Sequence, residues 1–127
     1  MYHKWYTASA LVNPKYPLQV VFYRTKKNNE PVREWLKELP RSERKIIGED
    51  IKTVQFDWPI GMPLVRKVDV SLWEVRSKIV NRISRVIFTV YGEFIVLIHG
   101  FIKKSQKIPI KDLRLAKKRL SNLRGNL

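Results

Sequence analysis

The sequence predicts a single α+β domain in which helices pack on one face of an antiparallel sheet. Apolar residues recur at helical spacing in the first half and near the C-terminus, whereas alternating or continuous apolar runs dominate most of the second half. The predicted element order is β-α-α-β-β-β-α. With 127 residues, the chain is long enough to form one sizeable core.

The first half is predicted to hold one strand and two helices. Residues 1–17 contain two prolines and no stable period, so we expect an extended arm before a domain over residues 18–127. The β-branched and aromatic run Val20–Tyr23 predicts a strand. Pro31 suits the first position of a helix that Pro40 ends. A second helix follows, for which Ser42 is a candidate N-cap. Its apolar stripe is Ile46, Ile47, Ile51 and Val54.

The second half is predicted to be rich in strands. Three apolar runs separated by turn signals indicate strands over Leu72–Lys78, Ile83–Tyr91 and Phe94–Ile102. A final helix is expected from about Pro109, with Leu113, Ala116, Leu120 and Leu123 on one face.

The composition excludes several classes of function. The chain has no cysteine, which excludes disulfides and a thiolate nucleophile, and its two histidines, His3 and His99, argue against a metal site. We therefore expect neither metal nor cofactor. No apolar run reaches the length of a spanning helix, and no signal peptide is visible, so we expect a cytoplasmic protein without a membrane partner. Glycine motifs for nucleotides are absent as well.

The charge of the chain points to a polyanionic partner. The 26 basic and 11 acidic side chains give a net charge of +15. Residues 1–63 carry 11 basic and 7 acidic side chains, whereas residues 64–127 carry 15 and 4. A nucleic acid that binds through the C-terminal half is the leading hypothesis.

Two predicted hairpins bring arginines together. Gly92-Glu93 suits a two-residue turn, and a symmetric pairing around it sets Arg85 opposite Gly100. The preceding hairpin sets Arg76 opposite Arg85. Like charges that lie directly opposite each other normally destabilise a sheet. Two arginines beside a glycine on an open face would, however, make a good binding site for a phosphate group.

His99 has two interpretations. In the same pairing it lies opposite Val86 and faces the helical core, which predicts a buried, hydrogen-bonded histidine. To act as a general acid or base it would have to reach the face of Arg85, which a β-bulge would allow.

Further basic and aromatic residues are candidates for RNA contact, although solvated surface charge is the simpler interpretation of the lysines. Lys103 and Lys104 end the third strand, and the pairing places Lys104 on the face of Arg85. The final helix and the segment before it, residues 103–124, carry nine basic residues and one acid. These basic side chains could be solvated, contact the phosphates of a nucleic acid, or bind an acidic partner. The RNA-binding candidates are Lys67, Lys78, Arg82, Lys107 and Trp58, the last as a platform for an unpaired base.

Three segments together carry a recognisable pattern: Leu72–Arg76, Arg85–Phe88 and His99–Pro109, the last with the string His-x-Phe-x-Lys-Lys-x-x-Lys-x-Pro. They resemble the HigB-like branch of the RelE toxin superfamily, which includes many phage-derived proteins. The likeness covers about residues 18–124 and implies a RelE-like fold. It also implies a toxin that cleaves mRNA, often on ribosomes, without a metal, and a helix-turn-helix antitoxin encoded beside it.

The resemblance also implies roles for individual residues. The substrate's own 2′-hydroxyl attacks the phosphate; Arg85 would grip that phosphate and Arg76 would stabilise the transition state. Lys103 or Lys104 would complete the cationic site or protonate the leaving oxygen, with Lys107 a weaker candidate. Two points stay open: the general base could be His99 or Glu74, and Arg82 could take the place of Arg85. Two other functions also stay open: a non-catalytic nucleic-acid-binding protein, and an inactive family member that binds an antitoxin.

Overall fold

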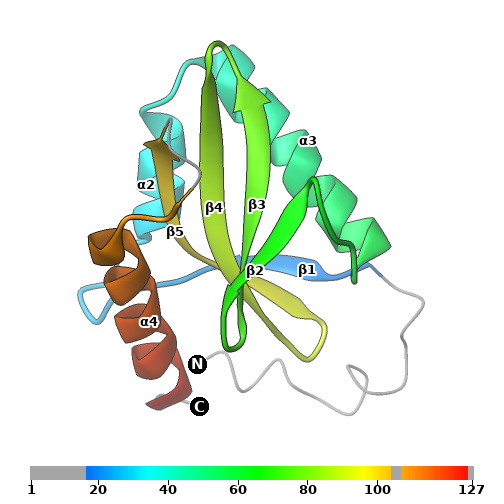
Figure 1. Cartoon of the computed structure of the whole chain (residues 1–127). Coiled ribbons are helices and arrows are strands. Elements are labelled where there is room, and N and C mark those ends of the chain that lie inside the picture. The colour runs from blue at the N-terminus through cyan, green and yellow to red at the C-terminus, as the bar shows by residue number, and fades with distance from the viewer. Residues whose placement is uncertain (1–16, 104–106, 126–127) are drawn as a thin grey trace.

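A computed structural model describes residues 17–103 and 107–125 of the chain. It contains a five-stranded sheet and three helices (Figure 1). The elements are β1 (Gln19–Phe22), α2 (Pro31–Lys37), α3 (Arg41–Asp57), β2 (Val65–Asp69), β3 (Leu72–Ile79), β4 (Arg82–Tyr91), β5 (Phe94–Lys103) and α4 (Ile110–Gly125). The α+β class is confirmed. The extended arm predicted over residues 1–17 lies almost wholly outside the described residues.

The sheet has the strand order β1-β5-β4-β3-β2. Neighbouring strands are antiparallel except for β1 and β5, which run parallel. β2 was not predicted from the sequence, so the predicted element order lacks one strand. This strand is short and lies at the edge of the sheet. Three of its five residues are charged, so it has no apolar run by which it could be predicted.

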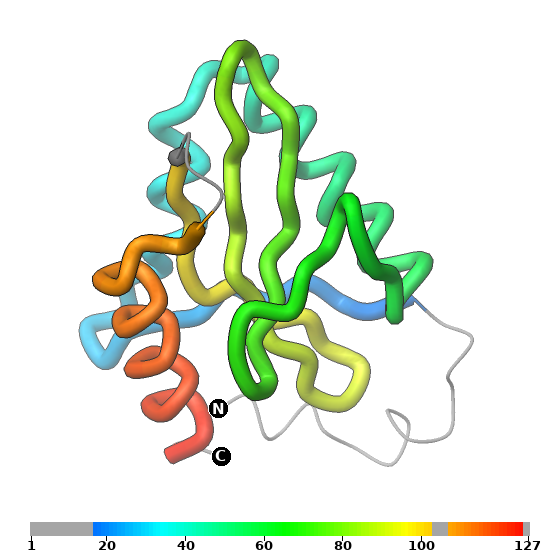
Figure 2. Tube along the Cα trace, viewed as in Figure 1, coloured from blue at the N-terminus to red at the C-terminus, as the bar shows by residue number. Residues whose placement is uncertain are grey.

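The helices cover both faces of the sheet, so the prediction that they share one face is wrong. Phe88 of β4 and Leu97 of β5 belong to a core formed with α2 and α3. Ile87 and Val96, their neighbours along the strands, belong to a second core formed with α4. Figure 2 shows α4 in front of the sheet and α3 behind it. Strands that are apolar on both faces require cover on both, and α4 provides the second layer.

The helices start close to the predicted positions. Pro31 begins α2, as expected from its fixed φ angle. α3 starts at Arg41 after Pro40, and no side chain caps its first turn, so the predicted cap at Ser42 is wrong. None of the helices in the described part of the chain is long and apolar enough to cross a membrane.

The two hairpins behave differently. The β3–β4 register is the predicted one and sets Arg76 opposite Arg85. In the β4–β5 hairpin, Gly92 takes a positive φ of 61°, and the predicted pairing holds from the turn as far as Phe88 and Leu97.

A β-bulge then shifts the β4–β5 pairing by one residue. Ile98 is the extra residue of β5, so that Ile87 lies opposite His99 and Arg85 lies opposite Phe101. The predicted pairs of Val86 with His99 and of Arg85 with Gly100 are therefore wrong. Gly100 instead lies opposite Val86 and faces α2, where a Cβ would overlap the ring of Trp35.

Candidate functional site

The α4-facing side of the sheet carries polar residues in two adjacent rows. In the first row, Arg66 pairs with Glu74, which lies opposite Ile87, and Ile87 lies opposite His99. In the second row, Arg76 pairs with Arg85 and Arg85 with Phe101. The bulge is what brings His99 onto this side, as the acid–base interpretation of that residue required.

The carboxylate of Glu74 lies at the centre of three arginines, which we call the arginine cluster: Arg66, Arg76 and Arg85. Its Oε1 atom is 3.0 Å from Arg66 Nη2, 3.5 Å from Arg85 Nη1 and 3.8 Å from Arg76 Nε. Its Oε2 atom is buried and has no hydrogen-bond partner among the residues that the structure describes. One carboxylate therefore orients three guanidinium groups from three neighbouring strands.

The members of the arginine cluster differ in their access to solvent. The side chain of Arg85 is 1% exposed, that of Arg76 13% and that of Arg66 32%. The predicted open face with Arg85 above a glycine is therefore wrong, because Arg85 is buried beside Glu74 and Phe101. Arg66 and Arg76 are the members that solvent can reach. Arg66 was not predicted as a site residue because it belongs to β2, a strand that the apolar pattern of the sequence does not reveal.

The electrostatics of the arginine cluster favour a bound anion. Burial lowers the pKa of Arg85; the carboxylate of Glu74 opposes this effect, and the charges of Arg76 and Arg66 add to it. Three guanidinium groups against one carboxylate leave these four side chains with an excess of positive charge. A phosphate oxygen near Arg66 and Arg76 would reduce the repulsion between them.

His99 is held between β5 and α4. Its Nε2 is 2.7 Å from Asp112 Oδ1, and its Nδ1 is 3.4 Å from Arg119 Nη1. Because Arg119 can only donate, this arrangement favours the neutral ring with the proton on Nε2. Burial lowers the pKa of His99, Asp112 opposes this effect, and Arg119 adds to it. The hydrogen bonding predicted for His99 is confirmed, but the side chain is 14% exposed and the ring faces α4 rather than α2 and α3.

Arg119 also anchors the bulge. Its Nη1 donates a hydrogen bond of 2.9 Å to the carbonyl oxygen of Ile98, the extra residue of β5. Arg119 and Asp112 lie seven residues apart, on the same side of α4. Their only signal in the sequence was that Asp112 is the single acid in a basic segment.

The structure separates the two candidate arginines of β4. Arg82 Nη2 donates hydrogen bonds of 2.7 and 2.6 Å to the two carboxylate oxygens of Glu43 in α3. This pair ties the start of β4 to the helix on the other side of the sheet. Of the two, Arg85 is the one that lies in the arginine cluster.

Comparison with protein families identifies the chain. A family model described as "Phage derived protein Gp49-like (DUF891)" matches residues 34–121, more than half of the chain. The chain belongs to the Gp49-like family. This toxin-like family is part of the RelE/HigB-like clan, which agrees with the resemblance at the level of the clan and implies a cognate antitoxin. A search of curated proteins found no match.

The match spans the elements that build the site of this Gp49-like protein. Residues 34–121 contain β2 to β5, with the arginine cluster and Glu74, and most of α4, with Asp112 and Arg119.

The lysine candidates of the Gp49-like chain are spread more widely. Lys103 ends β5 with its backbone opposite Ile83, two pairs beyond the pair of Arg85 and Phe101. Lys78 pairs with Ile83 from β3 and is exposed, and Lys107 is exposed ahead of α4. The site prediction for Lys104 falls on residues 104–106, outside the described residues.

Two RNA-binding candidates lie on the opposite side of the sheet. Trp58 packs edge-on against Trp73 and Phe88, with ring centroids 5.0 and 5.5 Å apart. Lys67 Nζ lies 5.7 Å from the centroid of the Trp73 ring. The expectation that Trp58 stacks on an unpaired base is not supported, because its ring belongs to the edge of the α2/α3 core.

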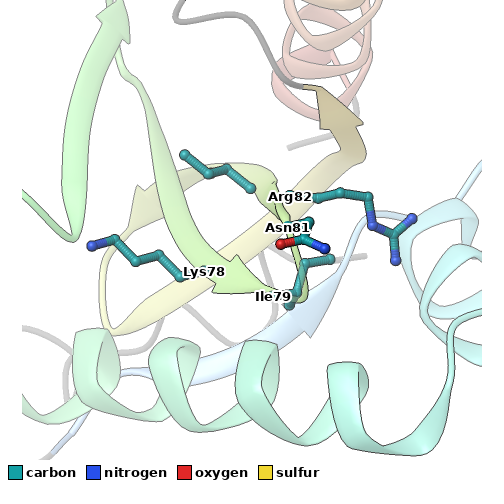
Figure 3. Close-up of a pocket in the computed structure, with 5 residues that line it drawn as sticks. Lys78, Ile79, Asn81 and Arg82 are labelled. Atoms are coloured by element: carbon teal, nitrogen blue, oxygen red, sulfur yellow. The ribbon is translucent and has the colours of Figure 1, made fainter.

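A surface hollow lies at the β3–β4 turn of the Gp49-like protein. It is lined by Lys78, Ile79, Asn81, Arg82 and Ile83. The side chains of Lys78 and Arg82 extend in opposite directions from it (Figure 3). The hollow therefore lacks converging cations, and the arginine cluster remains the better candidate site.

Proposed function

We propose that this Gp49-like protein is the toxin of a toxin–antitoxin pair and that it cleaves mRNA with the α4-facing side of its sheet. Membership of the RelE/HigB-like clan supports the toxin class. The observation that carries the RNA proposal is the arginine cluster around Glu74, since guanidinium groups bind phosphate oxygens through paired hydrogen bonds.

The proposed reaction is an internal displacement at phosphorus. The 2′-oxygen of the RNA forms a bond to the adjacent phosphorus while the bond to the 5′-oxygen breaks, which leaves a 2′,3′-cyclic phosphate and a 5′-hydroxyl. Negative charge grows on the non-bridging oxygens during this step, and fixed cations stabilise it without a metal.

In this proposal the arginines divide the work according to their exposure. Arg76 and Arg66, which solvent reaches, contact the scissile phosphate and stabilise the charge that develops on it. Arg85 lies beneath them and holds Glu74 in place, which replaces the direct grip expected from the sequence.

Both proton transfers need a partner. Glu74 and His99 both stay candidates for the general base: the Glu74 carboxylate is fully buried beside the three arginines, and both ring nitrogens of His99 already have partners. Lys103, at the end of β5, and Lys104 are the candidates that protonate the leaving 5′-oxygen.

Growth assays test the proposal. Expression of the wild-type protein without an antitoxin should arrest bacterial growth, and Arg76→Ala should remove the arrest because it removes a phosphate contact. The matched control is Arg33→Ala on α2, across the sheet, where the side chain pairs with Glu30 instead. This control should stay toxic, and thermal unfolding should confirm that both variants are folded.

Two results would contradict the proposal. Arrest by Arg76→Ala at the wild-type level would remove the arginine cluster from the reaction. A wild-type protein that binds RNA but produces no new RNA ends would instead be a non-catalytic nucleic-acid-binding protein.

A further inference from the structure

The solvent side of α4 carries cations and no acid. Its only acidic residue, Asp112, is buried and turned toward His99. The exposed basic residues of the helix, which we call the α4 cationic face, are Lys111, Arg114, Lys117, Lys118 and Arg124. Basic side chains alone are common on protein surfaces, so the inference depends on their arrangement.

Three of these residues form one stripe. Lys111, Arg114 and Lys118 lie at positions i, i+3 and i+7, which places them on the same side of the helix within about 10 Å along its axis. None of the three has an ion-pair partner among the described residues, whereas Lys117 lies 3.5 Å from Asp69. Their charges are therefore available to a ligand.

The helix that carries the stripe is firmly attached. Ala116, Leu120 and Leu123 pack into the core of the α4-facing side. Arg119 and Asp112 add hydrogen bonds to Ile98 and His99 of β5. Since α4 covers the same side of the sheet that holds the arginine cluster, the stripe and the cluster keep a fixed relative position (Figure 2).

We propose that the α4 cationic face binds the phosphate backbone of a double-stranded RNA segment, separate from the single strand at the arginine cluster. The choice of RNA rests on the proposed function. A rigid row of cations suits the regular phosphates of a duplex. α4 contains no aromatic residue on which an unpaired base could stack, which argues against a single strand.

The composition of the face also argues against a protein partner. Cores of protein–protein interfaces are enriched in aromatic residues, methionine and arginine and depleted in lysine. Of these enriched types the α4 cationic face offers only two arginines. The α4 cationic face has three lysines, and the exposed large apolar residue on α4 is Ile110 at its first position. An acidic protein segment is therefore the alternative to be tested rather than the expected partner.

The test compares two triple variants. Lys111→Ala, Arg114→Ala and Lys118→Ala together remove the stripe. Arg41→Ala, Lys45→Ala and Lys52→Ala remove the same charge and the same residue types from the exposed surface of α3, on the other side of the sheet. Alanine is the best helix former, so both variants should fold, which circular dichroism checks.

Binding to a blunt RNA duplex is measured by fluorescence anisotropy at KCl concentrations from about 50 to about 200 mM. In this range the affinity of a protein that contacts phosphates depends strongly on salt. Each phosphate contact contributes about 0.7–0.9 to the slope of log K against log salt. Loss of the stripe should therefore reduce the slope by about 2–3. The α3 variant should change it by less than about 1, because its residues do not touch the duplex.

Two outcomes would overturn the inference. Equal slope changes in the two variants would mean that only net charge matters. Preferential, stripe-dependent binding of a poly-glutamate peptide would assign the face to an acidic protein partner. Because a blunt duplex offers no single-stranded target, its binding is measured whether or not the protein cuts RNA. Failure to cleave mRNA would thus contradict the proposed function alone.

Discussion

The arginine cluster is held together by the carboxylate of Glu74. This carboxylate is fully buried, and its Oε1 atom lies within 3.8 Å of all three guanidinium groups. Removing one partner from a buried group of charges strongly destabilises a fold, because the remaining charges repel each other where little water can screen them.

Glu74→Gln should therefore destabilise the fold strongly. The change keeps the shape of the side chain but removes its charge, and we expect the free energy of unfolding to fall by about 3–5 kcal/mol in urea denaturation. Glu49→Gln on the exposed surface of α3 is the matched control and should change it by less than about 0.5 kcal/mol. A loss at Glu74 as small as that of the control would mean that the arginines do not need the carboxylate.

His99 should make the stability of the fold dependent on pH. Its pKa lies below the ordinary value of 6.5 because it is buried, so the unfolded chain takes up a proton at a higher pH than the folded protein. The stability that neutral His99 contributes is present above pH 6.5 and is lost as the pH falls through that value toward the lower folded pKa.

The comparison of wild type with His99→Gln isolates this effect. Unfolding free energies measured between about pH 5 and 8, the range in which a histidine titrates, should fall more steeply toward acid in the wild type than in the variant. Parallel curves for the two proteins would show that His99 does not titrate between the folded and unfolded states.

At this scale the sequence predicted some neighbours and missed others. Arg76 and Arg85 could be paired because the predicted symmetric loop over residues 79–82 gives the same register as the shorter turn that the structure has at residues 80–81. The burial of Arg85 could not be predicted, since its neighbours include Glu74, which lies two residue pairs away on the sheet, and Arg66 of the unpredicted strand β2. Arg66 could not be found before β2 was known.

Among the elements, the bulge in β5 decides what reaches the site. It leaves the half of β5 nearest the turn in the predicted register and shifts the half that carries His99 and Phe101. The apolar run Phe94–Ile98 contains no polar residue that would mark one face, so alternation along this strand could not reveal where the register changes.

The contact between β5 and α2 provides a test at the same scale. Gly100→Ala places a Cβ within 2.5 Å of the ring atoms Cε3 and Cζ3 of Trp35, so the substitution should reduce the free energy of unfolding by about 1–3 kcal/mol. Gly48→Ala on α3 is a useful control, because a Cβ there meets nothing within 4 Å and should stabilise the helix by about 0.5–1 kcal/mol. Opposite signs in thermal or urea unfolding are expected, and a tolerated Gly100→Ala would contradict the described packing.

Considered as a whole, the molecule uses both faces of one sheet for different purposes. The α2/α3 side is an apolar core, with Arg82 and Glu43 at its margin. The α4 side combines an apolar core with the arginine cluster, and α4 itself adds a cationic outer face. Much of the excess positive charge of residues 64–127 is thereby gathered on one side, which the division of charge along the chain could only indicate.

The α+β class was predictable because the helical and strand periods in this sequence are clear. The placement of α4 was not, since an amphipathic helix fits either face of a sheet that is apolar on both. The family match places the chain in a toxin-like family, which agrees with the resemblance carried by the His-x-Phe-x-Lys-Lys string, whereas the toxin activity, the reaction and the site residues are proposals.

The central claim is that the arginine cluster supports RNA cleavage by the substrate's own 2′-hydroxyl. The most direct measurement incubates wild type and Arg76→Ala with mRNA on translating ribosomes, with and without EDTA, and determines both the position and the chemistry of the new ends. We expect wild type to produce 2′,3′-cyclic phosphate and 5′-hydroxyl ends equally well in EDTA, and Arg76→Ala to produce few. New ends that carry a 5′-phosphate, or cleavage that EDTA abolishes, would contradict the claim.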